Sequence, residues 1–128
     1  MAILSFTVGS VSYNAATASA QDQDEILSLI GVETLRNIYT ASKDTPPAKT
    51  LVPMLMTLPQ SVKRRVAELL CAKLFVAGDD KVKVSVRDFE CRMVEWNQVL
   101  SELMTGNFAD FFTWLASVRE EETQTANS

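Results

Sequence analysis

The sequence contains no histidine, and only two cysteines, four glycines and four prolines occur among its 128 residues. Without histidine, the chain lacks the most common general base and the most common metal ligand. Cys71 and Cys91 are too few for a disulfide framework in a chain of this size, so we expect both thiols to be reduced. The shortage of glycine and proline favours long regular segments.

Long apolar runs and basic clusters are also missing. No segment approaches the roughly 18 apolar residues of a membrane-spanning helix, and the N-terminus has neither the basic flank nor the apolar run of a signal peptide. The net charge is −4, and Lys63-Arg64-Arg65 is the one basic block. Nucleic acid binding requires a more concentrated positive patch. We therefore expect a cytoplasmic protein that binds neither membranes nor nucleic acid.

The remaining composition is that of an ordinary globular domain. Apolar residues make up 47% of the chain and charged residues 22%, and both fractions are typical of soluble proteins. A chain of 128 residues is long enough for one hydrophobic core. We expect a single domain over residues 1–120, followed by a flexible polar tail over residues 121–128.

The apolar patterning predicts an α+β fold that is mainly helical with a small antiparallel β element. An alternating segment with Gly9-Ser10 at its centre predicts an N-terminal β-hairpin with strands at 3–8 and 11–14. A second alternating segment, 81–86, predicts a short strand that joins this hairpin, with three valines facing inward: Val82, Val84 and Val86.

Five to six helices are expected around these strands. Helical spacing of apolar residues predicts helices at about 19–30, 50–57, 60–77, 87–105 and 107–118, and the spacing of the first continues to about residue 42. Thr17 and Ser19 are both possible N-caps of the first helix, and Gly31 either ends that helix or interrupts it. Gly106 is expected to end the fifth helix, and Asn107 to cap the last one. The segment 43–48 is expected to be a loop, because its two prolines stop a helix.

No arrangement of residues typical of an enzyme is present. The closest acidic cluster, Asp22, Asp24 and Glu25, falls in the first turns of a predicted helix, where negative charge interacts favourably with the helix dipole. The glycines are isolated from one another, so the chain has no glycine-rich phosphate loop. No base accompanies the serines. We expect no enzymatic activity, no cofactor and no metal ion.

The most informative feature is the apolar segment 107–118. Four of its residues follow the i, i+3, i+4, i+7 spacing of one helical face: Phe108, Phe111, Phe112 and Leu115. Trp114 widens this face. A short helix with so much apolar surface must bury it in its own core or in a partner.

Aromatic and methionine side chains are the typical anchors of surfaces that bind amphipathic helices. Met54 and Met56 lie two positions apart, so one helical face cannot bury both, and one of them should lie near the surface. The candidate partner-binding residues are therefore Met54, Met56, Phe108, Phe111, Phe112 and Trp114. An apolar surface of this kind also favours self-association.

Three short motifs occur in order along the chain. The first is Phe6-Thr-Val-Gly-Ser-Val-Ser-Tyr-Asn-Ala15. The second is Met56-Thr-Leu-Pro59, which leads into a predicted helix that contains Cys71. The third is the alternating segment followed by Phe89, a long apolar helix and Asn107-Phe-Ala-Asp-Phe-Phe112.

In this order the motifs resemble one of the tail assembly chaperone families of long-tailed bacteriophages. The family opens with a similar hairpin, and it commonly ends its last helices with a similar Asn-Leu-Gly-x-Phe-Phe stretch. The resemblance covers most of residues 3–115. Two features depart from the family pattern: Gly9-Ser10 replaces an Asn-Gly-like turn, and the helix at 19–30 is acidic where the family often has basic residues or histidine.

The resemblance implies a non-enzymatic protein of the host cytoplasm that is absent from the mature virion. Its expected partners are the tape-measure protein, whose apolar stretches it keeps soluble, and the tail-tube protein, whose subunits it helps to recruit. Many such phages also make a longer form by ribosomal frameshifting. An alternative function is that of a small phage regulatory or inhibitory protein that binds a host factor, with its negative charge steering it to a basic partner.

Overall fold

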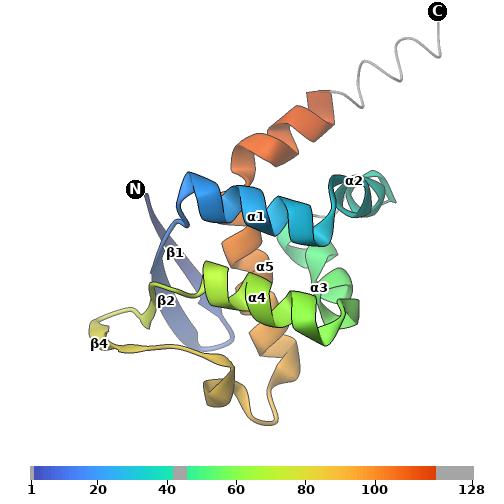
Figure 1. Cartoon of the computed structure of the whole chain (residues 1–128). Coiled ribbons are helices and arrows are strands. Elements are labelled where there is room, and N and C mark those ends of the chain that lie inside the picture. Colours follow the sequence, from blue (N-terminus) through green and yellow to red (C-terminus); the bar gives the residue numbers. More distant parts are fainter. Residues whose placement is uncertain (1, 42–45, 118–128) are drawn as a thin grey trace, which may run out of the picture.

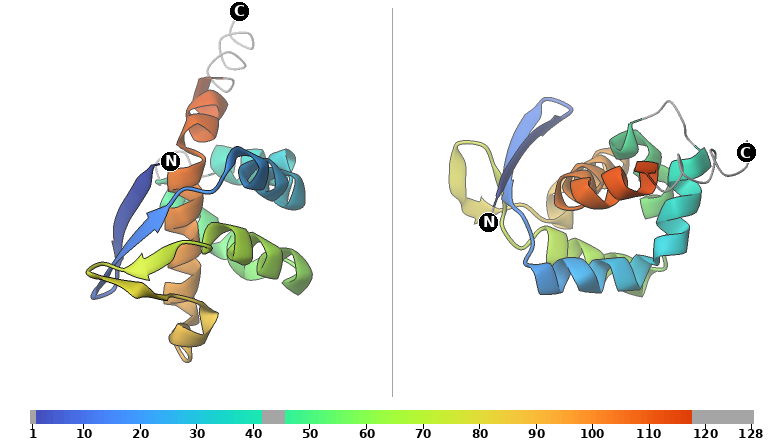
Figure 2. Two further views of the ribbon diagram at one scale, coloured as in Figure 1. Left: turned by 60° about the vertical axis from the view of Figure 1, so that its left-hand side comes forward. Right: turned by 90° about the horizontal axis from the view of Figure 1, so that it is seen from above.

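The computed structural model describes residues 2–41 and 46–117. Its mainly helical α+β architecture confirms the predicted fold class. Helix α5 (Met93–Asn107) runs through the middle of the molecule, with a small sheet on one side and helices α1 (Ala20–Ile30), α3 (Pro47–Thr57) and α4 (Gln60–Leu70) on the other (Figures 1 and 2). The predicted tail at 121–128 and residues 43–45 of the predicted loop lie outside the described residues. The loop prediction was wrong for Pro47 and Ala48, because α3 begins at Pro47, where proline fits the first position of a helix.

The sheet has four antiparallel strands in the order β1-β2-β3-β4. Strands β1 (Ile3–Val8) and β2 (Val11–Ala16) confirm the predicted N-terminal hairpin, and Gly9 takes a φ of 61° at its turn. A positive φ at this position is the reason that glycine suits the turn. The strand predicted at 81–86 is β4 (Asp79–Lys83), which joins the hairpin through β3 (Leu74–Val76).

Two expectations about this region were wrong. The helix predicted over 60–77 ends at Leu70, because residues 74–76 pair with β2 and bury Leu74 completely. Of the three valines expected to face inward, only Val84 is buried, whereas Val82 and Val86 are 65% and 48% exposed. Val86 starts the 3-10 helix η1 (Val86–Phe89) instead of continuing the strand, and the β3–β4 hairpin projects beyond the helices (Figure 1).

The helix boundaries settle several of the open alternatives. Ser19 is the N-cap of α1, since its hydroxyl accepts a hydrogen bond from the backbone N–H of Asp22 at 3.2 Å. Gly31, with a φ of 93°, ends α1, and α2 (Val32–Ala41) follows it directly. The helix predicted at 87–105 begins instead at Met93, after η1.

Gly106 does not end α5 but lies inside it, against strand β1. A Cβ atom at this position would come within 2.6 Å of Leu4 Cδ1. The missing side chain therefore allows the helix to approach the sheet closely, so Gly106 serves packing rather than helix termination.

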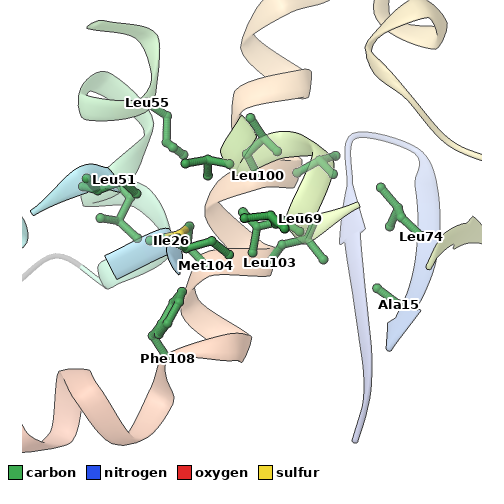
Figure 3. Packing of buried hydrophobic residues seen from close by; sticks show 14 of the residues in the cluster. Ala15, Ile26, Leu51, Leu55, Leu69, Leu74, Leu100, Leu103, Met104 and Phe108 are labelled. Carbon is green, nitrogen blue, oxygen red and sulfur yellow. The ribbon is translucent and has the colours of Figure 1, made fainter. Parts of the chain in front are cut away.

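The core surrounds α5 (Figure 3). Leu100, Leu103 and Met104 of this helix are completely buried, and they pack with residues of α1, α3 and α4 that include Ile26, Leu51, Leu55 and Leu69. A turn at residue 108 follows α5, and a final helical segment spans residues 109–117. We call this segment the C-terminal helix.

Candidate partner-binding surfaces

The C-terminal helix has one face in the core and one face in solvent. Phe112 and Leu115 of this helix are only 6% and 4% exposed, and Phe108 in the turn before it is 3% exposed. On the other side, Trp114 is 53% exposed and Phe111 is half-buried. The apolar segment that the sequence offered as one candidate surface is therefore divided between internal packing and accessible surface.

Three of the predicted partner-binding residues belong to the core. Phe108 points toward Met104 in Figure 3, Phe112 lies in the same buried cluster, and Met54 of α3 is 7% exposed. Their side chains already bury their apolar area inside the monomer, so they are not accessible to a partner in this conformation. Met56 is 44% exposed, which confirms that one member of the methionine pair lies at the surface.

The half-buried Phe111 and the exposed Trp114 form an aromatic pair. Their ring centroids are 5.8 Å apart with an interplanar angle of 41°. Phe111 also makes an edge contact with the buried Phe112 ring at 5.7 Å and 74°. The buried Phe112 ring thus supports the Phe111 side of the pair. The end of α3 that carries Met56 is well apart from the C-terminal helix in Figures 1 and 2, so Met56 is not part of this pair.

A second accessible surface is a groove of about 670 Å³ between α4, the β4–η1 segment and the start of α5. We call it the α4–β4 groove. Its lining includes Arg64, Cys71, Lys83, Val86, Met93 and Trp96. This groove has no signal in the sequence, because it depends on β4 and η1 lying opposite α4.

The interior of the groove is apolar. Trp96 and Val84 are 4% and 7% exposed at its base, and the Trp96 ring is supported by Phe89 at a centroid distance of 5.3 Å. Val86 and Met93 line it with side chains that are 48% and 47% exposed. These two side chains give the groove apolar surface that no other part of the described chain covers.

One lysine along the groove is fixed by an internal hydrogen bond. Lys63 Nζ donates to Asn97 Oδ1 at 2.5 Å, and Asn97 Nδ2 donates to the backbone carbonyl of Met93 at 2.7 Å. Partial burial lowers the pKa of Lys63 from its usual value. This network satisfies the buried Asn97 and connects α4 to α5.

The other charges give the groove a positive rim. Arg64 and Lys83 are exposed, and within residues 2–41 and 46–117 no carboxylate is seen within ion-pair distance of either. Glu68, the acidic residue of the groove, is paired with Arg65 at 3.4 Å. A chain with a net charge of −4 therefore carries unpaired cations beside an apolar surface.

Cys71 also lines the groove, but its chemistry is that of a packing residue. Burial raises the pKa of its thiol to about 12, so the sulfur stays protonated at neutral pH and is a poor nucleophile. Among the described residues, no group of three or more acidic or cysteine side chains lies close enough together to hold a metal ion.

Comparisons with protein-family models, curated proteins and solved structures gave no match. Across the described ranges, none of the helices has the length and apolar character needed to cross a membrane.

Proposed function

We propose that this protein is a phage tail assembly chaperone that binds apolar helices of the tape-measure protein and keeps them soluble during tail morphogenesis. It also helps to recruit tail-tube subunits, acts without catalysis or a cofactor, and works in the host cytoplasm without entering the mature virion. The ordered motifs over residues 3–115 support this proposal. A holding protein of this kind needs an accessible apolar surface rather than a reaction centre.

The observation that carries the proposal is the aromatic pair of Phe111 and Trp114. Tryptophan is among the residues that most often dominate binding energy when a partner covers them. Here the indole is 53% exposed in the monomer, and the opposite face of its helix is anchored by Phe112 and Leu115 in the core. A fixed aromatic surface can bind an apolar helix without losing much side-chain entropy on binding.

The test is co-expression of this chain with affinity-tagged segments of a tape-measure protein, followed by purification of the complex. We expect the wild-type chain to keep apolar segments in solution and to elute with them. Trp114→Asp and Phe111→Asp should abolish capture, because each places a charge in the apolar contact. Thr113→Asp is the matched control, since it adds the same charge to an exposed position of the same helix.

Circular dichroism and thermal unfolding of each variant separate loss of binding from loss of fold. An insoluble client in the presence of the wild-type chain, or undiminished capture by the folded Trp114→Asp variant, would refute the proposed role. Capture of a host factor from a lysate that contains no phage structural proteins would instead support the regulatory alternative. Sedimentation velocity of the same variants tests whether the aromatic pair also mediates self-association.

A further inference from the structure

We propose that the α4–β4 groove binds an amphipathic α-helix whose apolar stripe is flanked by acidic side chains. This inference goes beyond the proposed chaperone role, because the groove shares no residue with the aromatic pair of the C-terminal helix. It concerns the chemistry of the partner and holds for any protein segment with this pattern.

The size and the apolar lining of the groove suit an apolar helical face. Its volume of about 670 Å³ lies within the range of roughly 300–1,000 Å³ in which proteins bind largely apolar ligands. Val86 and Met93 are each about half exposed along it, while Trp96 forms a buried base. A helix that inserts one face would cover the two exposed side chains and leave its other face in solvent.

Two unpaired cations, Arg64 and Lys83, favour a negatively charged partner in the groove. Arg64 belongs to α4 and Lys83 to β4, so positive charge lies on two opposite sides of the groove. The Glu68 carboxylate is already engaged by Arg65. A helix with acidic residues on both sides of its stripe would pair with these cations, whereas a basic helix would be repelled. Basic segments of a second copy of this chain would be repelled by the same cations.

Trp96 provides a direct spectroscopic probe. The chain has two tryptophans, and Trp114→Phe leaves Trp96 as the only one while it retains an aromatic ring in the C-terminal helix. Two synthetic helical peptides with the same leucine stripe, one flanked by glutamate and one by lysine, are titrated against the full chain. We expect a change in Trp96 emission and binding about tenfold tighter for the glutamate peptide, with the difference shrinking at high salt.

Variants of the groove test the assignment of the site. The double variant Arg64→Glu with Lys83→Glu should reverse the peptide preference, and Val86→Asp should weaken binding of both peptides. Lys49→Glu is the control, because Lys49 is an exposed residue of α3 outside the groove. This charge reversal should leave the preference for the glutamate peptide intact. Thermal unfolding confirms that each variant is folded.

Equal binding of the two peptides, or an unchanged preference in the folded double variant, would overturn the inference. Concentration-dependent dimerisation that the double variant abolishes, without binding of either peptide, would also overturn it, since the occupant would then be a second copy. Failure here is distinguishable from failure of the chaperone role. The Trp114→Asp variant should lose tape-measure capture but still bind the glutamate peptide.

Discussion

Asn107 joins the end of α5 to the start of α1 through side-chain hydrogen bonds, and its replacement gives a sharp test of the packing there. The side chain is 7% exposed at the end of α5. Its Oδ1 accepts hydrogen bonds from the backbone N–H of Ala18 at 2.7 Å and from Gln23 Nε2 at 3.2 Å. Its Nδ2 donates to the backbone carbonyl of Leu103 at 2.8 Å. The residue expected to cap the last helix instead joins α5 to the start of α1.

The magnitude follows from these contacts. Asn107→Ala removes hydrogen bonds worth about 1 kcal/mol each and leaves the Ala18 N–H without its partner, for a loss of about 3 kcal/mol. The higher helix propensity of alanine returns about 0.6 kcal/mol. We expect the free energy of unfolding to fall by about 2 kcal/mol and the melting temperature by about 8 °C.

Urea unfolding followed by circular dichroism measures this loss. Asn107→Leu fills a similar volume but keeps water away from the Ala18 N–H, so it should be at least as destabilising as the alanine variant. A double-mutant cycle with Gln23→Ala should give a coupling of about 1 kcal/mol. An Asn107→Leu variant as stable as the wild type would refute the role of these hydrogen bonds. The volume of the side chain, rather than its hydrogen bonds, would then hold α5 and α1 together.

Three further predictions test other parts of the structure. Phe112→Ala should lower the free energy of unfolding by about 3–5 kcal/mol, whereas Trp114→Ala should change it by less than about 1 kcal/mol; similar losses in urea titrations would contradict the two-faced helix. Cys91 is exposed with a φ of 63°, so Cys91→Asn should raise the free energy of unfolding by about 1 kcal/mol, and a lower midpoint in urea would count against this. The hydrogen bond and charge of Arg65 hold the pKa of Glu25 below its usual value. Glu25 therefore contributes stability above the pKa it has in the unfolded chain, and this contribution is lost as the pH falls through the folded pKa. The stability difference between wild type and Glu25→Gln should shrink as the pH falls below about 4, and a constant difference would exclude this contribution.

Local patterns predicted the elements whose residues interact with near neighbours. The hairpin at Gly9 depends on a few adjacent residues and was found. At both ends of α1 the sequence left two alternatives, and the structure has Ser19 as the cap and Gly31 as the end of the helix. The β3 strand was missed because Leu69, Leu70 and Leu74 fit a helical spacing as well, and only pairing with β2 decides against it. Gly106 was misread for the same reason, since its role depends on Leu4, which is distant in sequence.

The candidate site shows the same division. The spacing of apolar residues identified the C-terminal segment and the methionine pair. It predicts how wide an apolar helical face is, but not which part of that face is buried. Which residues are covered depends on the packing around Phe108 and Phe112, and that packing leaves Trp114 and Met56 at the surface. The α4–β4 groove had no signal of its own, because its apolar and basic residues come from three separate elements.

The sequence by itself determined a mainly helical domain with an N-terminal hairpin and an unusually apolar C-terminal helix. It did so because backbone conformation follows from turn chemistry, capping and the period of apolar residues, all of which act over a few positions. Only the tertiary structure decided which apolar side chains are exposed and where unpaired cations meet apolar surface. Burial depends on what lies opposite a side chain, and in this protein the opposing residues come from strands and helices far apart along the chain.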